Sequence, residues 1–271
     1  MRDVCQKYIR FVTSLCWLID SVLCVIVAGV NAVTQLDDVL YVVCAAYSSI
    51  LRFSATTHEP LENIAIKAFK APFDIAACER TSQLYVADEV CIWRLSSTGH
   101  GRERWLSFTP HSLSVTSTRL LVTSSEPPHQ LIQFDSVGDE LRQVQLPDDV
   151  EPLGAVESPA GTFIVSHMNT KLNQHEVIEV NAVGEVLHQF SGSLGGTQHI
   201  AVDSHANVFV ADYNSRCVLL LDNRLSLCRV IIDEHQLNDQ WPLCLCYSQQ
   251  SAQLLVGFSD GYFMAFDVLR C

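Results

Sequence analysis

A short apolar run that recurs six times is the feature of this sequence that most limits how the chain can fold. The ends of consecutive runs are 44, 36, 43, 45 and 46 residues apart. An internal period of roughly 40–50 residues, with several short strands in each unit, is typical of the blades of β-propellers. The six runs lie at residues 40–42, 84–86, 120–122, 163–165, 208–210 and 254–256.

The order of segments within each unit is also regular. In the fifth unit an alternating run at 199–203 precedes the central run, a third run at 218–222 ends in Asp222, and a fourth run covers 228–232. Short runs of this kind, bounded by Gly, Asn, Asp and Ser, predict strands. The sequence therefore predicts an all-β fold, a six-bladed propeller with four-stranded antiparallel blades.

Two other fold classes explain the pattern less well. A β-sandwich would show turn residues at strand spacing but no longer period near 43. An α/β fold would need amphipathic helices of about ten or more residues between its strands, and none stands out after residue 30. A closed ring of blades also leaves few sheet edges unpaired.

The fifth unit resembles an NHL repeat, the blade unit of the six-bladed propellers at the C-terminal end of many tripartite-motif (TRIM) proteins. The second unit keeps a shorter version, Leu84 to Asp88. A WD40 propeller would share the period, but no Trp-Asp dipeptide occurs and Gly99-His100 stands alone. The matching residues are Ile200, Ala201, Val202, Asp203, Asn207, Val210, Ala211, Asp212, Asn214, Arg216 and Val218.

The resemblance implies a protein-binding platform rather than an enzyme. The RING, B-box and coiled coil that precede such propellers have no counterpart here, since the sequence contains no C-x-x-C pair and no heptads. Whether the chain is a fragment of a longer TRIM-like protein stays open. Some propellers of this family bind single-stranded RNA, which is one alternative function.

The charge balance argues against nucleic acid as the partner. The chain has 17 Lys and Arg against 30 Asp and Glu, a formal net charge of −13. Binding to phosphates needs a clustered basic surface. With 48% hydrophobic residues, the chain is also too apolar to be a disordered tail.

The N-terminal segment, residues 1–28, is apolar and admits three interpretations. Fifteen of the twenty residues from Phe11 to Val30 are apolar. Because the sixth unit ends at Cys271 after its third strand, we expect residues 11–19 or 22–27 to supply its fourth strand and close the ring. The alternatives are a cleaved signal peptide or a membrane anchor, and membrane contact is expected only with an anchor. The propeller itself is expected to cover residues 29–271.

The cysteines favour a reducing compartment. There are eleven, an odd number, and none has metal-ligand spacing. Eight lie in or beside predicted strands, where a small buried thiol is the usual role of cysteine. We therefore expect a cytoplasmic protein, with secretion or membrane anchoring through residues 1–30 as alternatives.

No motif identifies catalytic residues, and we predict no metal or cofactor. The glycine-rich stretch Gly192–Gly196 lacks the Lys of a phosphate-binding loop and is expected to turn the chain between blades. His111, His199 and His167 lie near strand ends that could face a central channel, but they have no ligand spacing. Asp203 and Asp212 are expected to accept hydrogen bonds from turn amides rather than to bind calcium.

The best candidates for binding lie in the loops that follow the central strands. These loops leave one face of a propeller, and binding residues concentrate on loops of rigid scaffolds. A non-catalytic protein-interaction platform is therefore the predicted function, with an unidentified protein as partner. The alternative to this and to RNA binding is a hydrolase or lyase with a metal in its channel. The candidate binding residues are Tyr47, Glu89, Glu126, Met168, Tyr213, Asn214 and Asp260.

Overall fold

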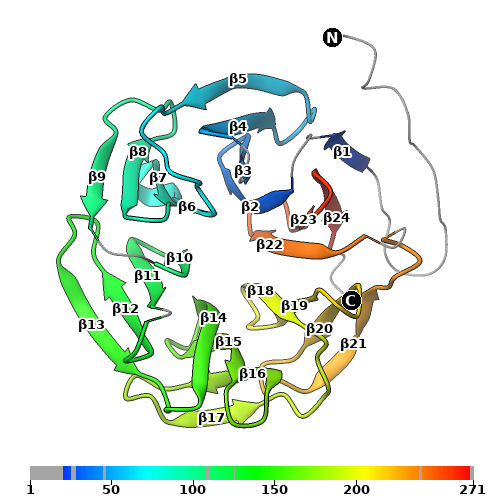
Figure 1. The fold of residues 1–271 in the computed structure, drawn as a ribbon. Helices are drawn as coiled ribbons and strands as arrows, with labels where there is room; N and C mark the ends of the chain where they lie inside the picture. The colour runs from blue at the N-terminus through cyan, green and yellow to red at the C-terminus, as the bar shows by residue number, and fades with distance from the viewer. Residues whose placement is uncertain are drawn as a thin grey trace.

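Six four-stranded antiparallel sheets stand around a central axis like the blades of a propeller (Figure 1). The structure is a computed structural model that describes residues 21–25, 29–44, 47–107, 110–124, 126–237 and 240–268. The predicted fold class is confirmed. Within this part of the chain there is no α-helix, and a single 3₁₀ turn occupies Glu79–Thr81.

Five blades are built from consecutive strands, ordered from the channel outward. The first two are β2 (Val30–Leu36), β3 (Val39–Cys44), β4 (Ser49–Ser54), β5 (Pro60–Ala65) and β6 (Asp74–Cys78), β7 (Gln83–Ala87), β8 (Ile92–Ser96), β9 (Glu103–Leu106). The next three are β10 (Ser112–Thr116), β11 (Arg119–Ser124), β12 (Gln130–Phe134), β13 (Glu140–Gln145), then β14 (Val150–Glu157), β15 (Phe163–Asn169), β16 (Gln174–Val180), β17 (Val186–Gln189), and β18 (Thr197–Val202), β19 (Val208–Asp212), β20 (Cys217–Leu221), β21 (Leu227–Ile232).

The sixth blade joins the two ends of the described chain. Its inner strands are β22 (Pro242–Ser248), β23 (Gln253–Phe258) and β24 (Tyr262–Asp267), and its outer strand is β1 (Ser21–Val25). β1 runs antiparallel to β24, with Ser21 opposite Ala265 and Leu23 opposite Phe263. The predicted closing strand is thus confirmed and comes from the second of the two expected donor segments. Residues 1–20 lie outside the described residues.

The core is divided among the six seams between neighbouring blades. In β7, for example, Leu84 and Val86 pack toward the first blade, whereas Tyr85 and Ala87 pack toward the third. A strand buried on both faces must be apolar at successive positions, which explains the six central runs of the sequence. All six runs fall in the second strand of a blade. The outer strand β17, by contrast, is exposed along its whole length.

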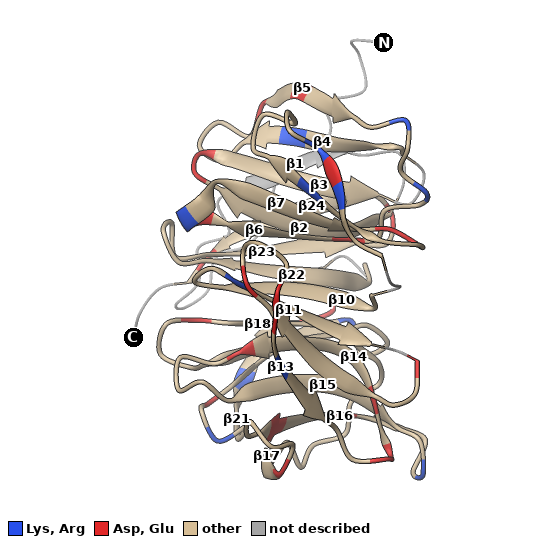
Figure 2. Ribbon diagram, turned by 90° about the vertical axis from the view of Figure 1, so that its left-hand side faces the viewer, with Lys and Arg blue, Asp and Glu red and all other residues tan. Residues whose placement is uncertain are grey.

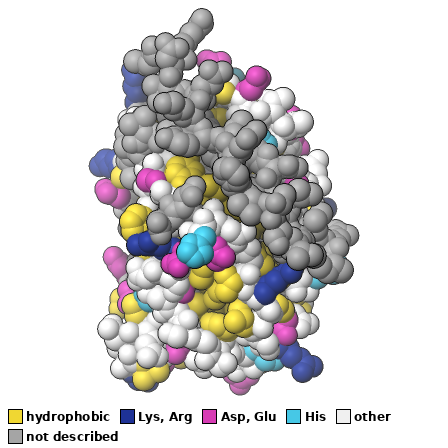
Figure 3. Space-filling view, turned by 90° about the vertical axis from the view of Figure 1, so that its right-hand side faces the viewer, with side chains coloured by type: hydrophobic (Ala, Val, Ile, Leu, Met, Phe, Trp, Pro, Cys, Tyr) yellow, Lys and Arg dark blue, Asp and Glu magenta, His cyan; other side chains and the backbone are white. Residues whose placement is uncertain are grey.

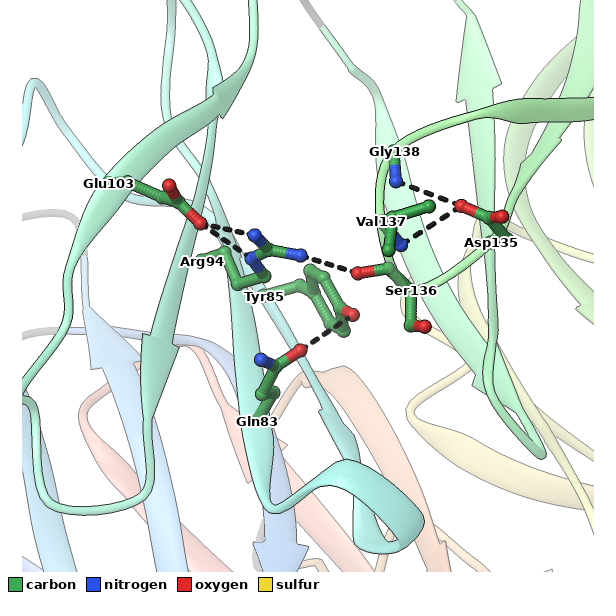
Figure 4. A network of polar contacts seen from close by, with 8 residues as sticks. All are labelled: Gln83, Tyr85, Arg94, Glu103, Asp135, Ser136, Val137 and Gly138. Carbon is green, nitrogen blue, oxygen red and sulfur yellow. Dashed lines mark hydrogen bonds and ion pairs between the residues drawn. The ribbon is translucent and has the colours of Figure 1, made fainter.

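Polar contacts reinforce the seam between the second and third blades (Figure 4). Arg94 of β8 binds Glu103 of β9 and reaches the backbone carbonyl of Ser136 in the next blade. Its guanidinium also lies 5.4 Å from the centre of the Trp105 ring. The Ser136 turn is shaped by Asp135, whose carboxylate accepts hydrogen bonds from Val137 and Gly138. Adjacent blades are therefore held by oriented polar groups as well as by apolar packing.

The molecule has two faces that differ in what they contain. We call the face where inner strands begin the start face; it carries the turns between second and third strands and the connections between blades. The opposite end face carries the turns between first and second and between third and fourth strands. In the edge-on view, charged residues lie mainly in the loops of these faces rather than within the strands (Figure 2).

In the described part of the chain, no helix has both the length and the apolar character needed to cross a membrane.

Candidate functional site

A ring of side-chain-to-backbone hydrogen bonds joins the inner strands around the channel. His111 Nδ1 donates to the Leu153 carbonyl at 2.9 Å, and Leu245 N donates to His199 Nδ1 at 3.4 Å. Asp74 accepts from Leu113 N at 2.6 Å. Each bond links the start of one blade to the inner strand of the next. Two of the histidines predicted near the channel are therefore at its wall, where they act as structural ties.

Two more ties bring to five the number of seams, out of six, that such a bond crosses among the described residues. Asn31 Nδ2 donates to the Pro72 carbonyl at 3.4 Å, between the first and second blades. The Cys244 thiol contacts the Val30 carbonyl at 3.8 Å, across the seam where the ring closes. The inner strand has a free edge toward the channel, so such bonds satisfy backbone groups that no further strand can reach.

The channel widens into a cavity of about 520 Å³ that opens toward the end face. Its lining includes Ala77, Val115 and Val156 together with His199 and Cys246. Burial raises the pKa of the Cys246 thiol to about 11, so the thiol stays protonated near neutral pH. Burial also lowers the pKa of His199, despite the opposing effect of Asp74, and keeps its imidazole neutral. The Cys246 thiol is therefore not an activated nucleophile near neutral pH.

No group of three or more His, Cys, Asp or Glu that could hold a metal ion occurs in the part of the chain that the structure describes. His167, the third histidine predicted near the channel, instead lies in the second strand β15, where Glu176 Oε2 is 3.5 Å from its Nε2. This expectation was wrong because the strand continues to Asn169, which places His167 in the seam rather than at a channel end.

Buried aspartates fix the loops of the start face. Asp88 accepts hydrogen bonds from the backbone of Lys70, Val90 and Cys91 and from the Trp93 indole at 2.7 Å. Burial alone would raise the pKa of Asp88, but these donors hold it below its ordinary value. The carboxylate thereby ties a turn within one blade to the connection that leads into that blade.

Asp212 has the same role in the fifth blade. Its carboxylate accepts from the backbone of Gly195, Gly196 and Ser215 at 2.9–3.4 Å. A Cβ at Gly195 or Gly196 would lie 2.9 Å from atoms of Asn214, so the two glycines allow the connection to approach this turn closely. The predicted turn-amide role of Asp212, and the predicted turn at Gly192–Gly196, are confirmed.

Asp203 binds turn amides on the end face, also as predicted. Its carboxylate accepts from the backbone of His205 and Asn207 and from the Asn207 side chain at 2.8 Å. The conformation of this turn therefore needs no cation.

All seven predicted binding residues lie on the start face, but they differ in exposure and position. Glu89, Glu126, Asn214 and Asp260 are exposed, whereas Tyr47 is half-buried against the core between the sixth and first blades. Met168 was expected in a loop, but it lies in β15. This hairpin is longer than the others and turns only at 170–173.

Three of these residues come together at the seam between the fifth and sixth blades. Tyr213 and Asn214 form the turn after β19, and Asp260 forms the turn after β23. Burial raises the pKa of Asp260, while a hydrogen bond from the Gln240 side chain opposes the shift. Because Gln240 belongs to the connection between β21 and β22, that connection joins the two turns. The other predicted residues are distributed over the remaining blades.

Sequence reasoning missed Trp241, which lies between these two turns. Its ring stacks on Tyr213, with centroids 6.3 Å apart and planes inclined by 28°. The Arg216 guanidinium lies 4.8 Å from the centre of the Trp241 ring. Trp241 follows a polar segment and precedes Pro242. A single tryptophan in a polar connection was the one sign of this site in the sequence. Its partners Tyr213 and Arg216 lie in another part of the sequence, so the cluster could not be predicted.

Comparison with known proteins supports the fold and no narrower identity. No protein-family model matches the chain, and no curated protein matches its sequence. The WD40 propeller domain of Doa1 superposes with a TM-score of 0.65 and 12% identity, over 94% of this chain and 98% of that one.

Two further structures show the same arrangement. A chain of a nidogen/laminin complex gives a TM-score of 0.63 at 16% identity, covering 77% of this chain and 81% of the other. A catalytically inactive virginiamycin B lyase from Staphylococcus aureus gives 0.62 at 11% identity, covering 92% and 80%. At such identities the similarity establishes a shared β-propeller fold and carries no information on activity.

Proposed function

We propose that this chain is a protein-interaction platform that binds a protein partner through its start face, in the manner of NHL-type propellers. The observation that carries the proposal is that all six blades contribute turns to this face and that the buried carboxylates of Asp88 and Asp212 fix two of them. A rigid surface binds with little loss of conformational entropy, which favours recognition of a folded or extended protein.

The fifth blade supports an NHL-like rather than a WD40-like platform. Asp203, Asn207 and Asp212, three of the residues shared with the NHL repeat, form the hydrogen bonds that shape the two ends of this blade. The similar chain from a nidogen/laminin complex comes from an assembly of two proteins. A TRIM-like context for this propeller is part of the same proposal.

The charge of the start face favours a protein partner over RNA. Its exposed acidic residues outnumber its lysines, and an acidic surface repels the phosphate backbone. The acidic residues are Glu89, Glu126, Asp148, Asp233, Glu234 and Asp260, and the lysines are Lys67, Lys70 and Lys171.

Charge reversal on each face tests the proposal. We expect Glu126→Lys and Glu89→Lys to reduce crosslinking of the purified chain to its partners in extracts by about tenfold, the effect of removing roughly 1.4 kcal/mol of binding free energy. The matched controls are Asp139→Lys and Glu185→Lys on the end face, which should leave the crosslinks unchanged. Loss of crosslinks only in the end-face variants would overturn the proposal.

A further inference from the structure

The cluster formed by Tyr213, Trp241 and Arg216, which we call the aromatic patch, is the strongest unassigned surface feature of the molecule. Trp241 has 36% of its surface exposed and is the one aromatic residue among the exposed large hydrophobic residues of the described chain. Its described counterparts are part of the core: Trp93 is buried between the first two blades, and Trp105 packs between the second and third. Trp, Tyr and Arg are the residue types that dominate binding energy at protein interfaces.

Hydrogen bonds fix the backbone of the segments that carry the patch. Tyr213 N donates to the Gly196 carbonyl at 2.7 Å, and Asp212 fixes the same turn from below. The Trp241 carbonyl accepts from Ser259 N at 3.2 Å, which ties the tryptophan to the sixth blade. Two blades and the connection between them thus hold three flat side chains in a stack. Such preorganisation lowers the entropy that binding must overcome.

Exposed acidic residues lie in the segments that carry or adjoin the patch. Asp260 stands exposed on one side, and Asp233 and Glu234 stand exposed at the start of the connection that carries Trp241. Burial and then the charges of Asp212, Asp233 and Glu234 raise the pKa of Cys217, the residue after Arg216, to about 11. On the side of the ring that Figure 3 shows, hydrophobic side chains lie near a histidine that is flanked by acidic side chains, with Lys or Arg side chains beside them.

We propose that the aromatic patch is a docking site for a partner segment that carries one large apolar side chain flanked by Lys or Arg. The apolar side chain would pack on the Trp241 and Tyr213 rings, and the basic residues would face Asp233, Glu234 and Asp260. This inference rests on the proposed function and adds the location of the site and the chemistry of the partner. A second copy of this chain fits the site poorly, since each copy carries a formal charge of −13.

The test uses two pools of synthetic nonapeptides as probes. Both pools contain a central Leu, Phe or Trp, flanked by Lys and Arg in the basic pool and by Glu and Asp in the acidic pool. The full chain labelled with 5-fluorotryptophan reports binding by fluorine NMR, and the Trp241→Phe variant assigns the Trp241 signal. We expect the basic pool to shift the Trp241 signal and to leave the Trp105 signal in place.

Variants locate the binding energy. Tyr213→Ala and Asp260→Asn should each weaken binding of the basic pool by about tenfold, a size usual for a residue that dominates an interface. Raising the salt concentration from about 0.05 to 0.5 M should also weaken it, because salt screens exposed charges. The control Val137→Ser, at an exposed residue of the end face, should have no effect. The inference is overturned if the basic pool leaves the Trp241 fluorine signal unshifted, or if the acidic pool binds as tightly as the basic pool.

The outcome is separable from the wider proposal. If Glu126→Lys and Glu89→Lys abolish crosslinking while the basic peptides leave Trp241 unshifted, the start face binds a partner elsewhere and only the aromatic patch fails. If both experiments fail, the platform function fails with it.

Discussion

In two blades a single buried carboxylate, Asp88 or Asp212, orders the start-face loops. Asp88 is fully buried and receives four hydrogen bonds from two segments. Asp88→Ala would leave those donors without a partner in a place that water does not reach. We expect the free energy of unfolding to fall by about 3 kcal/mol or more, since each buried unsatisfied group costs roughly 1–3 kcal/mol. Urea unfolding followed by circular dichroism measures the change.

Asp222 supplies a matched control for Asp88. Its carboxylate also accepts backbone hydrogen bonds within a turn, from Arg224 and Ser226, but the residue is half-buried and its turn faces solvent. Water can replace the carboxylate there, so Asp222→Ala should cost about 1 kcal/mol or less. Equal costs for the two variants would show that burial of Asp88 is not what matters.

The residues also show how far the sequence could predict the site. The turn roles of Asp88 and Asp212 were predictable because the same residue recurs at the same place in two units and acts locally. The role of Trp241 was not predictable, since it depends on Tyr213 and Arg216, and two strands, β20 and β21, separate these residues from Trp241 along the chain. Hydrogen bonds within a turn can be predicted from the spacing of residues in the sequence. A patch formed by residues of two blades can be recognised only once the arrangement of the blades is known.

Among the elements, β1 has the largest effect for its size because it converts an open stack of blades into a ring. It pairs with β24 and covers an edge that would otherwise be unsatisfied. We expect a chain lacking residues 1–28 to melt at least about 5 °C below one lacking residues 1–20, given that 1 kcal/mol changes the melting temperature of a domain of this size by roughly 2–4 °C. Differential scanning calorimetry compares the two.

The two truncations differ only by residues 21–28, so the comparison isolates the closing segment. Val22→Pro in the longer chain provides a second, milder variant, because proline removes a backbone donor from the strand opposite Met264. Identical melting temperatures for all three chains would contradict closure by β1.

Element positions were largely predictable, and the exceptions have a physical reason. The six central runs are apolar at successive positions because both faces of the second strand are buried, which makes them visible in the sequence. Where a strand ends depends on the length of its hairpin. β15 continues through His167 and Met168 to Asn169. His167 and Met168, which were expected in the loop after the strand, therefore belong to the sheet.

At the scale of the whole molecule, histidines buried in several blades make the fold sensitive to acid. Burial lowers the pKa of His58, His167, His175 and His199 below the ordinary value of 6.5. The unfolded chain therefore binds more protons than the folded chain as the pH falls through this value, and the free energy of unfolding decreases. We expect a lower stability at about pH 5.5 than at about pH 7.5 in urea titrations.

His167 tests this dependence on its own. Neither ring nitrogen has a hydrogen-bond partner, although Glu176 lies nearby and Asp149 and His175 act on its charge. His167→Leu removes the titrating group from this buried site and should make the acid-induced loss of stability smaller. His235→Gln, at an exposed position, is the control and should leave the pH profile unchanged. A steeper profile in His167→Leu would contradict this account.

The closing strand also has a consequence for synthesis. Ser21 of β1 finds its partner Ala265 244 positions later along the chain. At ribosomal speeds of about 5–20 residues per second, ~10–50 s separate the emergence of the two strands. During that interval the nascent chain carries an unpaired apolar strand at its beginning while successive blades form behind it. A ribosome that stalls before β24 therefore leaves β1 without the strand it pairs with, so the ring cannot close until β24 has been translated.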